Sequence, residues 1–291
     1  MASTIHYPVV WLQCAGCSGC SVSLLNSAAI TARQLVLDQV VPGKHVNLRF
    51  HPTIMAASGQ LAMEVLLGAK EDRGYLLVVE GAVPLAANGA FGAVGHAGGK
   101  ELTMADSVAE LAAESLAVVA LGTCAAFGGV PSAAPNPTGC VSVQEHLAKR
   151  GVKKPVVNIP GCPPHPDWFV GTVARVMVGG LPTADDLDEL GRPLAYFGKL
   201  VHETCPRRAD FEAGRFAARL GESGCLYQLG CKGPLSNADC PTRQWNNGTN
   251  WCVGANSPCH GCVEPQFPDG FSPLYEKIDE GRLARFKVTS K

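Results

Sequence analysis

The sequence is poor in charged residues. Only 17% of its 291 residues are Asp, Glu, Lys or Arg, and the net charge is −1, whereas roughly 25% charged residues is usual in soluble proteins. Lys and Arg form no runs, so the sequence lacks the basic surface that nucleic-acid binding requires, and we expect no nucleic-acid partner. No apolar run is long enough to cross a bilayer, so we expect no membrane span. Together with 46% hydrophobic residues, the low charge indicates either a large core or a surface that is buried under another protein chain.

The first residues also lack two features of exported proteins. They show neither a charged, then apolar, then small-residue leader nor a twin-arginine stretch. A cytoplasmic location is therefore expected. The alternative is a periplasmic location, if the sequence is that of a processed form.

Cysteine, in contrast, is abundant: the chain has thirteen and is too long to be a small disulfide scaffold. Six of them lie in the stretch from Cys225 to Cys262, which is rich in Gly, Pro, Asn and Asp and has no apolar periodicity. Thiolates around a soft metal are the obvious way to hold such a stretch together. Disulfides remain an alternative for some pairs, but the two-residue gaps of Cys17/Cys20 and Cys259/Cys262 suit a metal or a redox dithiol better.

Residues 6 to about 180 alternate short apolar runs with amphipathic segments. The predicted strands are Tyr7–Leu12, His45–Phe50, Tyr75–Val79, Leu116–Leu121 and Pro155–Ile159. The predicted helices are Ser18–Leu25, Leu61–Leu67, Ala105–Glu114, Ser142–Arg150 and Trp168–Val178. The strand runs are continuously apolar, which is typical of strands buried on both faces, and the alternation predicts a doubly wound parallel α/β sheet.

The stretch Gly179–Pro193 contains several Gly, Pro and Asp residues and is predicted to be a hinge. We therefore expect two domains. Residues 1–180 contain the α/β sheet, and residues 181–291 form a smaller, loop-rich domain that is mostly irregular or helical.

The Gly-rich stretch Gly89–Gly99 has glycines at roughly dinucleotide-type spacings, but it does not connect a strand to a helix in a βαβ unit. We expect it to be a loop.

Four cysteines follow predicted strands of the first domain. Cys17 and Cys20 follow the first strand, Cys124 the fourth and Cys162 the fifth. The carboxyl ends of strands in an open parallel sheet converge on one crevice, so these thiols are expected to meet, and four thiolates suit either zinc or an iron–sulfur cluster. A flavin phosphate is the other usual occupant of such a crevice, but this loop offers cysteines where that site needs Ser and Thr.

The second domain supplies two further groups of candidate ligands. One group has a histidine three positions before a cysteine: His202, Cys205, Cys225 and Cys231. The other group is Cys240, Cys252, Cys259 and Cys262. With the first domain, these make three sets of four that use eleven cysteines and one histidine. Cys14 and Cys140 are left over, and we expect both to be bystanders.

The chain carries nine motifs that resemble, in order, those of the small subunit of nickel–iron hydrogenases: WLQCAGCSGCSVSLLN, FHPTIMA, VVEGAVP, GTCAAFGG, NIPGCPPHPDW, HETCPRR, GCLYQLGCKGP, CPTRQWN and PCHGCVEP. The resemblance implies a flavodoxin-like first domain, a loop-rich second domain and a line of three iron–sulfur clusters. It also implies tight pairing with a large subunit that holds the nickel–iron centre and converts H2 to protons and electrons. On this resemblance the chain has no catalytic residue of its own, and it carries electrons to or from an external carrier: a cytochrome, a ferredoxin or a further subunit.

The resemblance also assigns the ligands. A proximal [4Fe–4S] cluster, nearest the active site, matches Cys17, Cys20, Cys124 and Cys162. A distal [4Fe–4S] cluster matches His202, Cys205, Cys225 and Cys231. The medial cluster matches Cys240, Cys252, Cys259 and Cys262.

At the medial cluster the sequence departs from the common pattern of the family. Many members have proline at the position of Cys252 and hold a [3Fe–4S] cluster. A fourth thiolate here predicts a medial [4Fe–4S] cluster, or a [3Fe–4S] cluster if Cys252 is not a ligand. This feature is similar to the nickel–iron–selenium branch of the family.

Two further expectations concern the ligand sets. Structural zinc without a redox role is the alternative reading, although the first set is spread over three distant loops, unlike a compact zinc ribbon. We also expect the helix that begins at Ser18 to direct backbone N–H groups toward the proximal site.

Overall fold

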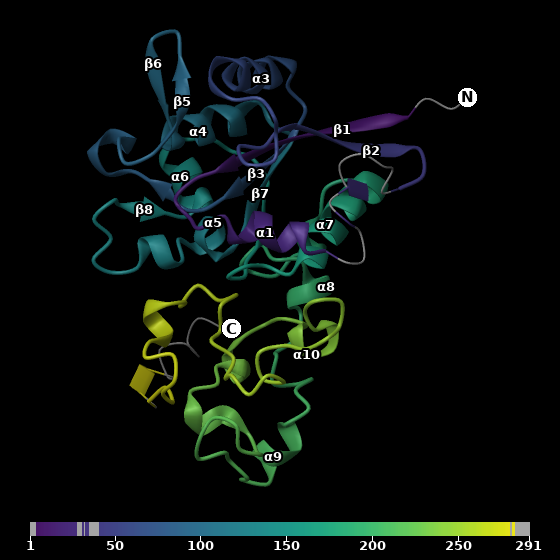
Figure 1. Ribbon diagram of the computed structural model, residues 1–291, viewed down its shortest axis with the longest axis vertical. Coiled ribbons are helices and arrows are strands. Elements are labelled where there is room, and N and C mark those ends of the chain that lie inside the picture. Colours follow the sequence, from purple (N-terminus) through teal and green to yellow (C-terminus); the bar gives the residue numbers. More distant parts are fainter. Residues whose placement is uncertain (1–3, 28–30, 32, 35–40, 280, 283–291) are drawn as a thin grey trace. The chain divides into compact units, whose positions relative to one another are not determined.

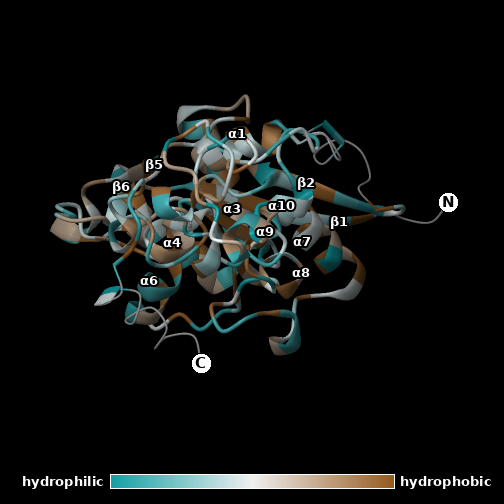
Figure 2. Ribbon diagram, turned by 90° about the horizontal axis from the view of Figure 1, so that it is seen from below, coloured by the Kyte–Doolittle hydropathy of each residue, from teal (hydrophilic) through white to brown (hydrophobic). Residues whose placement is uncertain are grey.

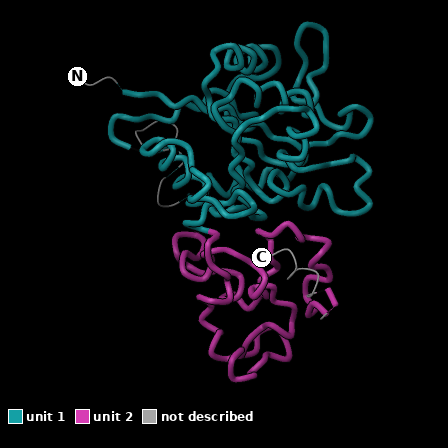
Figure 3. The backbone as a smooth tube through the Cα atoms, turned by 180° about the vertical axis from the view of Figure 1, so that it is seen from behind, with its two compact units in different colours: residues 1–196 teal, residues 197–291 magenta. Residues whose placement is uncertain are grey.

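The computed structural model describes residues 4–27, 31, 33–34, 41–279 and 281–282. The chain divides into two compact units, Met1–Tyr196 and Phe197–Lys291 (Figure 3). Unit 1 is built on five parallel strands in the order β2-β1-β3-β7-β9 (Figure 1). Their bounds are β1 Ile5–Gln13, β2 Lys44–Phe50, β3 Leu76–Glu80, β7 Ala117–Leu121 and β9 Val156–Ile159. Counted among the parallel strands alone, this is the flavodoxin order 2-1-3-4-5, and all five predicted strands are confirmed.

The helices cover both faces of this sheet. Their bounds are α1 Gly19–Leu25, α3 Gly59–Asp72, α4 Met104–Glu114, α6 Val143–Lys149 and α7 Pro166–Gly179, which confirms the five predicted helices. Successive strand residues point to opposite faces. Val10 and Leu12 of β1 belong to the core formed with α3, α4 and α6, whereas Trp11 packs edge to face on Phe169 of α7.

The central strands are apolar because both of their faces are covered. Every residue of β3 and of β7 is buried, as expected for a parallel sheet between two helical layers. Figure 2 colours the ribbon by hydropathy, with hydrophobic residues in brown and hydrophilic ones in teal. Glu80, the last residue of β3, is also buried, so it needs polar partners inside the protein.

The Gly-rich stretch expected to be a loop contains a β-strand instead. β5 Ala93–Ala97 pairs antiparallel with β6 Lys100–Thr103. The two residues between them, Gly98 and Gly99, both have positive φ, at 58° and 75°. A two-residue hairpin turn with positive φ at both positions matches the twist of the flanking strands and favours glycine.

The stretch expected to be a hinge is a packed part of unit 1. The Asn158 backbone N–H donates to the Gly191 carbonyl at 2.9 Å, and its side-chain amide donates to the Leu190 carbonyl at 2.7 Å. Arg192 is only 4% exposed and pairs with Asp188 at 2.7 Å. These contacts satisfy buried polar groups of β9 and of the segment itself, which explains why the segment stays with the sheet.

Unit 2 is loop-rich, as expected. Its helices are short: α9 Arg208–Glu212, α10 Cys240–Arg243 and the 3-10 helices Leu226–Leu229, Gly233–Leu235 and Asp269–Phe271. In the described part of this unit, β-structure is limited to isolated bridges.

The remaining elements of the chain are β4 Val83–Pro84, β8 Cys140–Val141, α5 Thr123–Phe127, α8 Leu194–Phe197 and the 3-10 helices Ala86–Gly89, Val130–Ser132 and Ala184–Asp186.

Among the residues that the structure describes, no helix combines the length and the hydrophobicity that crossing a bilayer requires.

Candidate metal centres

The four predicted proximal ligands come from three segments of unit 1. Cys20 lies in α1 with Cys17 just before it, Cys124 lies in α5 after β7, and Cys162 lies between β9 and α7. Burial raises the pKa of the Cys20 thiol, and repulsion from Glu80 and from the other three thiols raises it further. Electrostatic repulsion weakens with distance, so the four thiols lie in one neighbourhood of unit 1.

Glycines make room around the proximal thiols. A Cβ atom on Gly122 would lie 2.5 Å from the Cys20 sulfur, and the φ angle of Gly122 is +86°. A Cβ atom on Gly129 would lie 3.1 Å from the Cys124 sulfur and 2.9 Å from its backbone nitrogen. The backbone thus approaches the sulfurs more closely than any residue with a side chain allows.

The expectation that the α1 backbone directs its N–H groups toward the proximal site is wrong for Cys20 and Ser21. The N–H groups of Cys20 and Ser21 donate to the Glu80 carboxylate, at 3.1 and 3.2 Å. The Trp11 indole N–H donates to the same carboxylate at 3.0 Å. A buried carboxylate requires several donors, so Glu80 takes the N–H groups that were expected to face the site.

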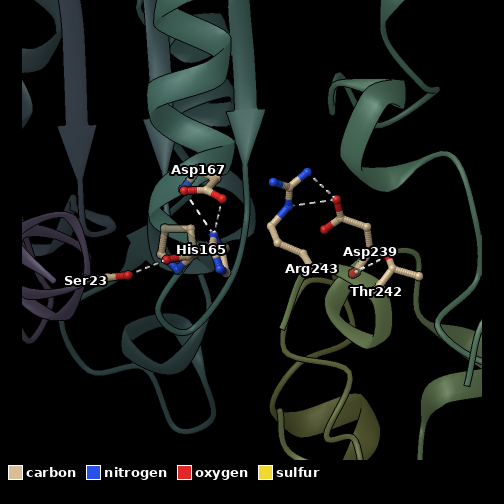
Figure 4. A network of polar contacts seen from close by, with 7 residues as sticks. Ser23, His165, Asp167, Asp239, Thr242 and Arg243 are labelled. Atoms are coloured by element: carbon tan, nitrogen blue, oxygen red, sulfur yellow. Dashed lines mark hydrogen bonds and ion pairs between the residues drawn. The ribbon is translucent and has the colours of Figure 1, made fainter. Parts of the chain in front are cut away.

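Two hydrogen bonds fix the loop that carries Cys162. Ser23 of α1 donates from its hydroxyl to the Pro164 carbonyl at 2.7 Å, and the Asp167 N–H donates to Nδ1 of His165 at 3.1 Å. Figure 4 shows Ser23, His165 and Asp167 from close by. The first bond ties the Cys162 loop to the helix that carries Cys20, and the second caps the start of α7.

The four predicted distal ligands line one small cavity in unit 2. Its walls include His202, Cys205, Cys225 and Cys231. Burial lowers the pKa of His202, and the nearby Arg208 lowers it further, so the ring is neutral at pH 7, the form that binds metals. The ring packs edge to face on Phe211, with centroids 4.6 Å apart, which limits its rotation.

Backbone N–H groups two residues further along the chain donate to four of the unit 2 thiols. The pairs are Arg207 to Cys205, Tyr227 to Cys225, Gly233 to Cys231 and Gly261 to Cys259. Each bond lowers the pKa of its thiol, although burial raises that pKa by more in all four cases. At Cys259 a hydrogen bond with Cys252 raises the pKa further still. Such bonds stabilise a thiolate and are typical of the surroundings of metal-bound cysteines.

The four predicted medial ligands also lie together. Burial raises the pKa of Cys240 well above its usual value, followed by repulsion from Cys262 and Cys259. A hydrogen bond with the Cys252 thiol raises the pKa of Cys259, followed by burial. Cys240 begins α10, a helix braced by the Arg243–Asp239 pair at 2.7 Å (Figure 4).

The two leftover cysteines are buried in unit 1. Cys14 is 7% exposed, and burial raises its pKa to about 12. Cys140 is 3% exposed, and its sulfur lies 3.2 Å from the Thr138 hydroxyl. Both thiols belong to the apolar interior, whereas Cys17 and Cys162 are exposed.

Glu80 and Lys232 are buried charged residues near the candidate ligands that the sequence analysis missed. Glu80 receives the hydrogen bonds described above, and Lys232, 1% exposed, directly follows Cys231. A charge at the end of a continuously apolar strand was an available signal for Glu80. Lys232 had the weaker signal of a charge beside a candidate ligand.

The donor set suits a soft metal. Eleven thiols and one imidazole prefer iron or zinc over the cations that bind to oxygen. Among the residues that the structure describes, no three His, Cys, Asp or Glu side chains stand close enough to hold one metal ion. In an iron–sulfur cube each protein ligand binds a different iron, so its ligands do not converge on a single point.

Two family models match the chain. Residues 17–176 match "NADH ubiquinone oxidoreductase, 20 Kd subunit", and residues 197–275 match the C-terminal region of the NiFe/NiFeSe hydrogenase small subunit. The periplasmic [NiFeSe] hydrogenase small subunit of Desulfomicrobium baculatum is 46% identical over 92% of this chain and 86% of that protein. The periplasmic [NiFe] hydrogenase small subunit of Solidesulfovibrio fructosivorans is 42% identical over 94% of this chain and 82% of that protein.

These relatives correct the expected location. Both are described as periplasmic, as is a third from Nitratidesulfovibrio vulgaris at 42% identity. The cytoplasmic expectation is therefore wrong, because it relied on the first residues of the sequence, which say nothing about the export of a partner or of a processed chain.

Solved structures agree with the sequence relatives. The Desulfomicrobium baculatum [NiFeSe] hydrogenase structure has a TM-score of 0.87 at 44% identity, covering 94% of this chain and 99% of that one. The recombinant [NiFeSe] hydrogenase of Desulfovibrio vulgaris Hildenborough has a TM-score of 0.88 at 43% identity, covering 95% and 99%. The fold, the order of the motifs and these likenesses show that the chain belongs to the family of NiFe/NiFeSe hydrogenase small subunits.

Proposed function

We propose that this chain is the electron-carrying subunit of a nickel–iron or nickel–iron–selenium hydrogenase. It passes electrons between the H2-converting centre of a large subunit and an external carrier. The observation that carries the proposal is the grouping of its candidate ligands into three sets of four. The proximal set collects residues from three distant segments of the chain, and within each set the thiols influence one another's pKa or line one cavity.

We further propose that each set binds a [4Fe–4S] cluster. The proximal ligands are Cys17, Cys20, Cys124 and Cys162; the medial ligands are Cys240, Cys252, Cys259 and Cys262; the distal ligands are His202, Cys205, Cys225 and Cys231. Burial and mutual repulsion disfavour the thiolate at positions such as Cys20 and Cys240. Bound iron supplies the positive charge that reverses this preference.

When bound, such clusters accept and release single electrons at potentials set by their surroundings. The residues of this chain hold those surroundings rigid. The glycines beside Cys20 and Cys124 bring the backbone close, and the N–H groups two residues beyond the unit 2 ligands stabilise the thiolates. Apolar neighbours such as Phe211 and Trp251 exclude water from the distal set.

The proposed medial [4Fe–4S] type depends on Cys252. Its thiol lies within hydrogen-bond reach of Cys259, which supports a role for Cys252 as ligand of a fourth iron. Proline at this position offers no ligand, so the corner would stay without iron.

The test uses the anaerobically purified complex with its large subunit. About twelve irons in this chain's clusters are expected from three four-iron clusters, together with brown colour and paramagnetic signals on reduction. A colourless preparation that contains zinc and no iron in this chain would contradict the proposal and favour a structural zinc subunit.

A further inference from the structure

Lys232 is a lysine in the interior of unit 2. Its side chain is among the most buried of the large residues, at 1% exposure. The ammonium donates to the carbonyls of Glu276 at 2.8 Å and Leu274 at 3.0 Å, and it lies 3.4 Å from that of Pro273. Lysine is almost never fully buried unless its charge is compensated, so this position needs a physical reason.

The three acceptors are those of a charged ammonium. An ammonium group has three N–H donors and no acceptor, and here the three acceptors are backbone carbonyls. Carbonyl dipoles stabilise a cation without neutralising it, in contrast to a carboxylate, which would form an ion pair. The site therefore holds a net positive charge in a region of low dielectric constant, where charges interact strongly.

The charge lies between two of the proposed ligand sets. Lys232 follows Cys231 of the distal set, and its backbone N–H donates to the carbonyl of Cys259, of the medial set, at 2.6 Å. The Cys259 N–H in turn donates to the Cys231 sulfur.

We propose that Lys232 is a positioning residue for electron transfer: its buried charge raises the reduction potentials of the medial and distal clusters. Reduction adds negative charge to a cluster, and a nearby cation stabilises that form. The two clusters thereby stay reducible although their ligands are thiolates in an apolar setting. This inference rests on the proposed function, because it requires clusters at both sets.

The experiment is a redox titration of the complete heterodimer, followed by the paramagnetic signals of the reduced clusters. Lys232→Met removes the charge and keeps the length of the side chain. At a potential where the wild-type clusters are half reduced, we expect the ratio of reduced to oxidised medial and distal clusters to fall about tenfold, which corresponds to about 59 mV for a one-electron couple. Lys232→Arg restores the charge, and we expect it to recover most of the shift.

Lys277→Met is the matched control, because Lys277 is an exposed lysine of the same unit, 5.3 Å from the centroid of the Tyr227 ring. Water screens its charge, so we expect little change. If Lys232→Met loses iron, Lys232→Gln, which keeps side-chain donors without the charge, replaces it. If Lys232→Met or Lys232→Gln keeps its clusters and their reduction potentials do not shift, this inference is overturned and the proposed function is not. If the wild type gives no cluster signals, the proposed function is overturned.

Discussion

His51 illustrates how a single buried residue links stability to pH. The ring is 1% exposed; its Nδ1 accepts from the Thr53 N–H, and its Nε2 lies 3.2 Å from the Ser21 hydroxyl. Burial lowers its pKa to about 4, although the charge of Glu80 acts in the opposite direction. The folded protein thus keeps His51 neutral at pH values where an unfolded chain would bind a proton.

The expected consequence is a loss of stability in acid. The pKa of an unfolded histidine is about 6.5, so the contribution is complete above that pH and falls away toward pH 4, by up to about 3 kcal/mol. We expect the melting temperature of the heterodimer to drop less between pH 7 and pH 5 in His51→Gln than in the wild type. The exposed His96 provides the control, His96→Gln. Equal drops in all three proteins would show that His51 does not carry this dependence.

The proposed type of the medial cluster depends on a single thiol, that of Cys252. We expect Cys252→Pro to convert the medial cluster from four irons to three, because the corner beside Cys259 loses its ligand. The conversion should produce a new paramagnetic signal in the oxidised protein and a higher medial potential. Cys140→Ala, which removes a buried thiol outside the three sets, should leave both unchanged. A wild type that already shows the oxidised-state signal in full amount would rule out the four-iron assignment.

Among the elements, the loop from β7 into α5 shapes the proximal site most directly. Gly122 has a φ angle of +86°, and an added Cβ would lie 2.5 Å from the Cys20 sulfur. Gly122→Ala therefore combines left-handed backbone strain, roughly 1–2 kcal/mol, with displacement of a proposed ligand. We expect the purified complex to lose about four irons, those of one [4Fe–4S] cluster.

Gly151→Ala separates the two effects. Gly151 also has positive φ, +69°, but nothing lies within 4 Å of the position of a Cβ atom there. This variant should be destabilised by strain alone and keep its full iron content. Equal iron contents in the two variants would mean that the Gly122 contact does not matter for the cluster.

Elements with a strong local signal could be predicted from the sequence. β3 and β7 are continuous apolar runs because both of their faces are buried. The sequence alone therefore predicts that these two segments are buried strands. The hairpin of β5 and β6 was missed because its strands are short and rich in small residues, and its turn is specified by the pair Gly98–Gly99. The hinge expected at Gly179–Pro193 relied on Gly, Pro and Asp content, which does not reveal that the segment packs on β9 through Asn158.

Partners that are distant in the sequence explain the rest of what was missed. The carbonyls that hold Lys232 lie more than forty residues further along the chain, and the donors to Glu80 come from β1 and α1. No local pattern encodes such contacts. The candidate ligands, in contrast, were predictable because cysteine spacing and strand ends are visible in the sequence.

At the scale of the whole molecule, the three ligand sets differ in their protection from solvent. Two proximal ligands, Cys17 and Cys162, are exposed; of the medial ligands only Cys252 is exposed; no distal cysteine is exposed. Beside the proximal set, Val22 and Leu25 of α1 are exposed apolar side chains, at 62% and 52%. We expect the large subunit to cover these two side chains, because exposed apolar side chains are typical of protein–protein contacts.

This gradient predicts an order of iron loss. In the chain produced without its large subunit, we expect an iron chelator to remove the proximal cluster first, then the medial and last the distal cluster, because chelation requires access to the ligands. We expect the proximal cluster to be protected in the heterodimer, because a large subunit packed over its exposed thiols would block the chelator. Loss of the cluster signals over time, measured in parallel on both preparations, provides the comparison. Loss of the distal cluster first, or equal proximal loss with and without the large subunit, would contradict the expectation that the partner completes this site.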